Sequence, residues 1–137
     1  MGDSWSFLIL RDAFFGVRRF DGLLKTTGAS PNILSARLKK LVSFGILEKR
    51  AYHQKPLRFE YRLTEKGRDL YPAIVLLMKW GDRWAGANGV DDANSAAKPP
   101  IALIHRTCGL AIDPILECDK CGEPITVQDM EWKAIGD

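Results

Sequence analysis

The stretch SPNILSARLKKLVSFG, residues 30–45, decides the fold. Ser30 is a favoured helix N-cap and Pro31 suits the first helical position, so a helix is expected to begin here. Four apolar residues follow at the i, i+4, i+7, i+8 spacing of an amphipathic helix: Leu34, Leu38, Leu41 and Val42. Gly45 is placed to end the helix. Its other face is polar and basic, with Asn32, Ser35, Arg37, Lys39 and Lys40.

Two helices are expected before this segment. Residues 5–14 are apolar over much of a helix circumference, which predicts a largely buried helix. Phe20, Leu23 and Leu24 then repeat at i, i+3, i+4, ahead of Gly28, which suits a helix C-cap. A short helix, a tight turn and a basic amphipathic helix therefore follow one another.

A basic hairpin and a long helix are expected after it. Residues 46–52 and 59–63 predict two short strands joined by residues 53–56. The hairpin is rich in basic residues: Lys49, Arg50, Lys55, Arg58 and Arg62. Thr64 caps a last helical segment from residue 65 to about residue 84. Pro72 must either start a new turn in it or kink its axis, because proline removes a backbone donor.

This order of elements describes a winged helix-turn-helix, in which one helix fits the DNA major groove and the hairpin flanks it. The expected fold class is α+β, mainly helical, with a small C-terminal β-rich tail. Residues 1–85 would form a winged helix-turn-helix domain for DNA binding and dimerisation, and residues 101–137 a small cysteine-containing module. Residues 86–100 are small, polar and rich in Pro and Gly, which predicts a linker.

The charge changes sign across the predicted linker. Residues 1–85 carry 16 Lys and Arg against 8 Asp and Glu, a balance of +8, whereas residues 86–137 carry 4 against 9, a balance of −5. The first part is therefore the candidate for binding a polyanion. No apolar stretch reaches the roughly 20 residues of a membrane helix and no signal peptide opens the chain, so we expect a cytoplasmic protein without a membrane partner.

Three stretches resemble the HxlR-type regulators, which are relatives of the MarR group. They are LRDAFFGVRRFD at residues 10–21, NILSARLKKL at 32–41 and EYRLTEKG at 60–67, and the likeness covers about residues 4–84. The resemblance implies a dimeric, sequence-specific DNA-binding regulator of transcription that is not an enzyme. Such regulators usually carry a further N-terminal helix, often with a redox-sensitive cysteine. The sequence starts at Met1 without it, so we expect no sensing by that cysteine and a dimer that relies more on the last helix.

Nine residues are candidate contacts to double-stranded DNA: Arg18, Arg19, Asn32, Ser35, Arg37, Lys39, Lys40, Lys55 and Arg58. Asn32 and Ser35 lie near the start of the third helix, where side chains reach base edges, and Asn can pair with adenine through two hydrogen bonds. The three basic residues that follow on this helix could contact bases or phosphates.

The remaining four candidates flank that helix. Arg18 and Arg19 precede the second helix, where positive charge and free backbone N–H groups suit a phosphate contact. Lys55 and Arg58 on the hairpin would meet the flanking DNA backbone or the minor groove. For every one of the nine residues, the alternative is a solvated surface side chain with no role in DNA binding.

The last helix is expected to hold a homodimer. Its apolar residues lie on more than one face of the helix, and the core of one small domain could hardly bury all of them. They are Ile74, Val75, Leu76, Leu77, Met78, Trp80 and Trp84. The alternative is that these residues complete the core of the monomer.

The tail contains all three cysteines, and an odd number without an export signal argues against a disulfide framework. HRTCG at residues 105–109 and CDKCG at 118–122 each place two potential ligands three residues apart and follow them with glycine. Such turns direct side chains to a tetrahedral point, as in zinc knuckles. We expect a structural zinc site, with a metal-free hairpin of reduced thiols as the alternative. The ligands of the zinc ion would be His105, Cys108, Cys118 and Cys121.

Two other classes of function fit the sequence less well. An enzyme could be imagined around His53, Cys108 and Asp113, but His53 is expected at a hairpin tip and no nucleophile motif or glycine-rich phosphate loop is present. A winged helix that binds only other proteins is a common reuse of the fold. Its third helix would be expected to be neutral or acidic, whereas this one carries three basic residues.

Overall fold

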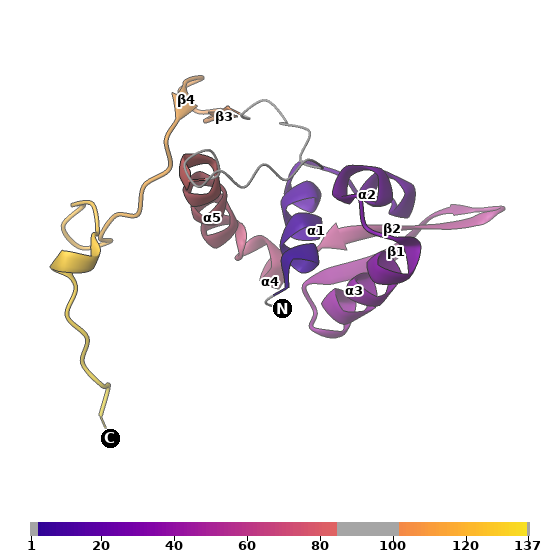
Figure 1. The fold of residues 1–137 in the computed structure, drawn as a ribbon, viewed down its shortest axis with the longest axis horizontal. Helices are drawn as coiled ribbons and strands as arrows, with labels where there is room; N and C mark the ends of the chain where they lie inside the picture. Colours follow the sequence, from indigo (N-terminus) through magenta and orange to yellow (C-terminus); the bar gives the residue numbers. More distant parts are fainter. Residues whose placement is uncertain (1–2, 85–101, 137) are drawn as a thin grey trace. The chain divides into compact units, whose positions relative to one another are not determined.

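The structure, a computed structural model, describes residues 3–84 and 102–136 (Figure 1). The chain divides into two compact units, Met1–Leu77 and Met78–Asp137, and the division falls inside the helix that ends at residue 84. The predicted linker at residues 86–100 lies outside the described residues, so the three-part organisation expected from the sequence stays a prediction.

The first unit contains the helices and the hairpin that the sequence indicates. In chain order the elements are α1 (Ser4–Phe14), α2 (Phe20–Thr27), α3 (Pro31–Ser43), β1 (Leu47–Gln54), β2 (Leu57–Leu63), α4 (Glu65–Arg68) and α5 (Tyr71–Trp84), which continues into the second unit. Strands β1 and β2 pair antiparallel as a two-stranded wing (Figure 1). The predicted mainly helical fold with a small hairpin is confirmed.

Helix α3 is built as its sequence predicts. The Ser30 hydroxyl accepts a hydrogen bond from the backbone N–H of Ile33 at 3.3 Å, and Pro31 occupies the first turn. After the helix, Gly45 adopts a φ of +72°, a conformation that glycine reaches without steric cost. The three leucines of the apolar stripe, at positions 34, 38 and 41, are fully buried, which leaves the opposite face of α3 in solvent.

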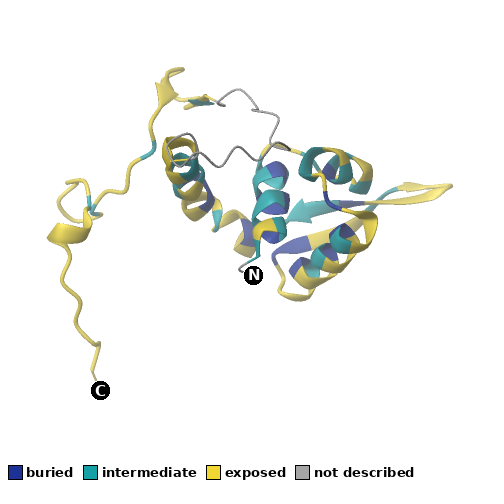
Figure 2. Cartoon of the chain, viewed as in Figure 1, coloured by how far each residue is buried: buried dark blue, intermediate teal, exposed yellow. Residues whose placement is uncertain are grey.

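The apolar core of the winged helix is built by side chains of α1, α2, α3, the start of β1 and α5. Figure 2 shows buried residues along α1 and α3 and at the start of β1. The buried apolar residues are Ile9, Leu10, Leu23, Ala29, Leu34, Leu38, Leu41, Ile46, Leu47, Ile74 and Val75. Removal of this apolar surface from water is the main force that fixes α3 against α1.

Both strands of the wing are longer than the sequence predicts. Strand β1 continues to Gln54, and the pairs His53↔Arg58 and Gln54↔Leu57 leave only Lys55 and Pro56 in the turn. His53 therefore lies at the end of a strand, and its Nδ1 atom is 2.9 Å from the carbonyl oxygen of Pro56. Polar composition suggested a longer loop, but backbone pairing across the hairpin extends both strands.

The last helical segment is two helices rather than one. Helix α4 ends at Arg68 and α5 begins at Tyr71, with Pro72 in its first turn. Proline is tolerated there because first-turn N–H groups have no partner within the helix. Pro72 therefore lies at the beginning of a new helix and does not kink a continuous one. Thr64 caps α4 as predicted, and its hydroxyl accepts a hydrogen bond from the N–H of Gly67 at 3.1 Å.

The described part of the second unit after α5 is extended and open. It contains β3 (Leu103–Ile104), which pairs antiparallel with β4 (Ala111–Ile112), a bridge between Glu117 and Pro124, and the short 3-10 helix η1 (Val127–Asp129). No residue among 102–136 is buried. Within the described ranges of the chain, no helix has the length and apolar character needed to cross a membrane.

Candidate nucleic-acid interface

The exposed face of α3 carries most of the predicted base-contacting residues. Asn32, Ser35 and Lys39 follow the i, i+3, i+7 spacing that places side chains on one face of a helix, and Lys40 lies beside them. All four are exposed, in contrast to the three buried leucines on the opposite face of α3. The structure therefore presents a polar, positively charged surface on a helix that the core holds from behind.

Arg37 lies differently from its neighbours on α3. Its guanidinium Nε donates to Asp3 Oδ1 at 3.0 Å and forms an ion pair with that carboxylate. The same Asp3 oxygen accepts the backbone N–H of Ser6 at 2.9 Å, which caps the start of α1. Arg37 thus fastens α3 to α1, a contact that local sequence patterns do not reveal because the partners are far apart in the chain.

Asp3 is held in its charged form. The hydrogen bond from the Ser6 backbone N–H is the largest cause that lowers the pKa of the Asp3 carboxyl far below its ordinary value of 3.8, and the Ser6 hydroxyl and Arg37 add to it. Each of these contacts favours the carboxylate over the carboxylic acid.

Asp3→Ala is expected to lower the free energy of unfolding by about 1 kcal/mol at neutral pH, because the N-cap of α1 and the partner of Arg37 are both lost. A lowered carboxyl pKa contributes stability above its unfolded value, here near 3.8, and loses it as the pH falls through the folded value. The difference between wild type and variant should therefore be constant from pH 7 to about pH 4 and shrink only in stronger acid. Urea unfolding at several pH values measures it, and a difference that shrinks above pH 5 contradicts this assignment.

The start of α2 is fastened to the wing. The guanidinium of Arg19 lies 4.3 Å from the centre of the Tyr52 ring on β1, and the carbonyl oxygen of Arg18 accepts the N–H of Tyr61 on β2 at 2.7 Å. Arg19 is the N-cap residue of α2, and no side chain caps this end of the helix. The exposed arginines at positions 18 and 19 therefore stand beside free backbone N–H groups, as a phosphate site requires.

Four of the five basic residues of the wing fall into two groups, and the fifth, Lys49, is exposed with its Nζ atom 4.5 Å from the centre of the Phe59 ring. Arg50 and Arg62 lie beside carboxylates of their own strands, at 3.7 Å from Glu48 and 2.6 Å from Glu60 respectively. Lys55 and Arg58 are exposed at the tip, and within residues 3–84 and 102–136 neither takes part in an ion pair. Lys55 and Arg58 therefore place two positive charges at the tip of the wing where a polyanion can reach them.

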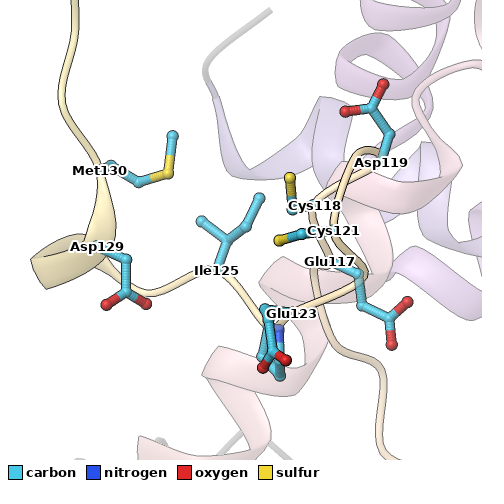
Figure 3. Close-up of a pocket in the computed structure, with 9 residues that line it drawn as sticks. Glu117, Cys118, Asp119, Cys121, Glu123, Ile125, Asp129 and Met130 are labelled. Carbon is cyan, nitrogen blue, oxygen red and sulfur yellow. The ribbon is translucent and has the colours of Figure 1, made fainter.

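The predicted metal ligands form two pairs in the second unit. Cys108 Sγ lies 3.7 Å from His105 Nδ1, and Figure 3 shows the thiols of Cys118 and Cys121 next to each other. Backbone N–H groups of Cys121 and Lys120 donate to the Cys118 sulfur and lower the pKa of its thiol. In the part of the chain that the structure describes, no three His, Cys, Asp or Glu side chains gather closely enough to hold a metal ion, so the zinc site stays a prediction.

Comparison with known protein families identifies the family of the winged-helix part of the chain. The sequence profile of the HxlR-like helix-turn-helix family matches residues 1–88. The chain belongs to this family. The resemblance and the fold expected from the sequence are confirmed, and this HxlR-like protein is a transcriptional regulator with a DNA-binding helix-turn-helix domain.

Individual relatives agree with the family. The HTH-type transcriptional regulator MT3179 of Mycobacterium tuberculosis is 47% identical over 130 residues, which cover 95% of this chain and 77% of the relative. The crystal structure of PA1607, described as a candidate transcription factor, is similar with a TM-score of 0.74 and 33% identity over 96% of this chain and 87% of its own. For PA1374 of Pseudomonas aeruginosa, also described as a candidate transcription factor, the TM-score is 0.65 and the identity 32%, over 97% and 85% of the two chains. These names indicate regulators rather than enzymes.

Proposed function

We propose that this HxlR-like regulator binds specific DNA sequences as a homodimer, with α3 in the major groove and the β1–β2 wing against the flanking DNA. The observation that carries the proposal is the polar and basic face of α3, which stands in solvent while three leucines on the opposite face are fully buried. Because its apolar face stays packed on the core, such a helix can enter the major groove of DNA with its exposed face. The compartment in which it acts is then the one that holds the chromosome, the cytoplasm.

Individual residues take different roles in this proposal. Asn32 is in the first turn of α3, where its amide can form two hydrogen bonds with adenine. Ser35 and Lys39 extend the same face toward the next bases or phosphates. Arg37 is fastened to Asp3, so its main role is to set the position of α3 rather than to read a base.

Contacts to the DNA backbone come from both sides of α3. The uncapped start of α2, with Arg18 and Arg19, offers positive charge and N–H donors to one phosphate. The exposed tip of the wing offers Lys55 and Arg58 to the backbone or the minor groove on the other side. These contacts fix the register of the helix in the groove, whereas base contacts supply the sequence preference.

A stripe on α5 supports the homodimer. Ala73, Leu77, Trp80 and Trp84 recur at i, i+4, i+7, i+11 and lie on the side of the helix away from the buried Ile74 and Val75. Leu77, Trp80 and Trp84 are 53%, 65% and 43% exposed. A second copy of α5 covers such a stripe because the same apolar spacing is present on both partners. The two α3 helices would then meet successive major grooves about 34–36 Å apart, on a near-palindromic operator.

Salt titration tests the phosphate contacts. Lys55→Ala and Arg58→Ala are each expected to weaken binding to all sequences alike and to reduce the log–log salt slope by about 0.9, because one phosphate contact is lost. Fluorescence anisotropy with labelled duplexes at several salt concentrations measures the slope. Lys133→Ala removes an exposed lysine outside the winged helix and serves as the matched control. Equal, salt-insensitive binding of every duplex would contradict the proposal and favour a winged helix that binds proteins.

A further inference from the structure

The second unit contains the same turn twice. In the first copy the N–H of Gly109 donates to the carbonyl of His105 at 2.7 Å, and the N–H of His105 donates to that of Leu110 at 3.0 Å. In the second copy, thirteen positions later in the sequence, Gly122 donates to Cys118 at 2.9 Å and Cys118 donates to Glu123, also at 2.9 Å.

The backbone of the two copies agrees in its conformation as well. Gly109 and Gly122 have φ angles of +72° and +75°, which an L-residue rarely adopts. A short antiparallel pairing closes each turn, β3 with β4 for the first and the Glu117–Pro124 bridge for the second. The similarity therefore extends from sequence spacing to hydrogen bonds and dihedral angles.

Each turn places its two ligand-type side chains close together. His105 Nδ1 and Cys108 Sγ are 3.7 Å apart in the first turn. In the second, the Cys118 sulfur accepts the N–H of Lys120 at 3.4 Å, and Cys121 lies beside it (Figure 3). Each turn is thus shaped as half of a tetrahedral site.

The geometry points to one structural zinc ion per chain, held jointly by the two turns through His105, Cys108, Cys118 and Cys121. Three thiolates and one neutral imidazole give a net charge of −1 with Zn²⁺, a donor set that closed structural zinc sites use. The structure shows the ligands as two pairs, so the ion would bring the second turn against the first. Residues 109–117 connect them and are long enough to allow this, since an extended residue spans about 3.3 Å.

The lack of a core gives the ion its structural role. None of residues 102–136 is buried, and large apolar side chains such as Leu110, Ile115 and Leu116 are more than half exposed. A segment that buries so little apolar surface gains stability from a metal ion that crosslinks it. All four coordination positions come from the protein, so no metal-bound water remains to be activated and no hydrolytic activity follows.

The test uses the full chain, purified under reducing conditions without chelator and then reconstituted with zinc and desalted. We expect one equivalent of zinc per chain, and X-ray absorption with three sulfur ligands at about 2.3 Å and one nitrogen at about 2.0–2.1 Å. Substitution with Co²⁺ should give the visible spectrum of a tetrahedral thiolate site. Zinc should also protect residues 102–136 from limited proteolysis, a readout that does not depend on DNA binding.

Variants assign the ligands. Cys118→Ser and His105→Ala should each lose most of the bound zinc and the proteolytic protection, while Thr107→Ser, an exposed non-ligand position inside the first turn, should keep both. The proposal is overturned if reduced protein fails to retain stoichiometric zinc after reconstitution, or if Cys118→Ser binds as much zinc as wild type. A Cys118–Cys121 disulfide that persists under these reducing conditions would also overturn the proposal, because the oxidised sulfurs could not bind zinc as thiolates.

Discussion

The double variant Leu77→Asp, Trp80→Asp is expected to be a monomer of 15.3 kDa with operator affinity at least about 100-fold below wild type. The two residues stand at adjacent positions of the exposed stripe on α5 and make no part of the buried core. Two carboxylates placed in the middle of an apolar interface would lose hydration and repel their counterparts on the second copy. Once the dimer is lost, each α3 must bind its half-site without the effective concentration that the partner provides.

Sedimentation velocity at micromolar concentration and anisotropy with a two-half-site duplex measure the two effects. The variant should keep the helical circular dichroism and the cooperative unfolding of wild type, because Ile74 and Val75 still complete the core. Trp132→Asp, which changes an exposed tryptophan outside α5, is the control and should remain dimeric. A wild-type protein that stays monomeric with and without DNA, or a double variant that still dimerises, contradicts the assignment of α5.

Leu38→Ala is expected to lower the free energy of unfolding by about 2–5 kcal/mol. Leu38 is fully buried at the centre of the α3 stripe, so the shorter side chain leaves a cavity where α3 packs on the core. A loss of this size is a large fraction of the stability of a small domain, and DNA affinity should fall with the folded fraction.

Lys39→Ala, one position further along the same helix, separates the two roles of α3. It removes an exposed charge without touching the core, so unfolding should change by less than about 0.5 kcal/mol while DNA affinity falls. Urea denaturation followed by anisotropy under native conditions compares the two variants. Our account of α3 fails if Leu38→Ala unfolds like wild type, or if Lys39→Ala loses as much stability as Leu38→Ala.

The fold could be predicted from the sequence wherever local rules govern it. Ser30, Pro31 and the leucine repeat predict α3 because capping and amphipathic spacing act within a few residues. The length of the wing was missed because strand pairing depends on the partner strand, and polar residues near a turn resemble a loop. At Pro72 the sequence allows two outcomes, a kink or a new helix, and local rules alone do not choose between them.

The features of the candidate site that the sequence did not reveal are contacts between distant segments. The Asp3–Arg37 ion pair and the stacking of Arg19 on Tyr52 join residues that no periodicity relates. Gly67 is a further example, because a side chain there would overlap the carbonyl oxygen of Ile46. The sequence was sufficient to place Asn32 and Lys39 on the exposed face of α3. The positioning role of Arg37 could be recognised only from its ion pair with Asp3 in the structure.

Sequencing the DNA fragments that the purified protein retains from its own genome tests the central claim most directly, with Asn32→Ala analysed in parallel. We expect wild type to enrich one near-palindromic sequence with half-sites about one helical turn, 10–10.5 base pairs, apart. Asn32→Ala should relax the preference at particular base pairs within each half-site, at a cost of about 1–3 kcal/mol for the intact operator. Recovery of fragments with no shared sequence, or an unchanged preference in Asn32→Ala, would contradict the reading of DNA bases by α3.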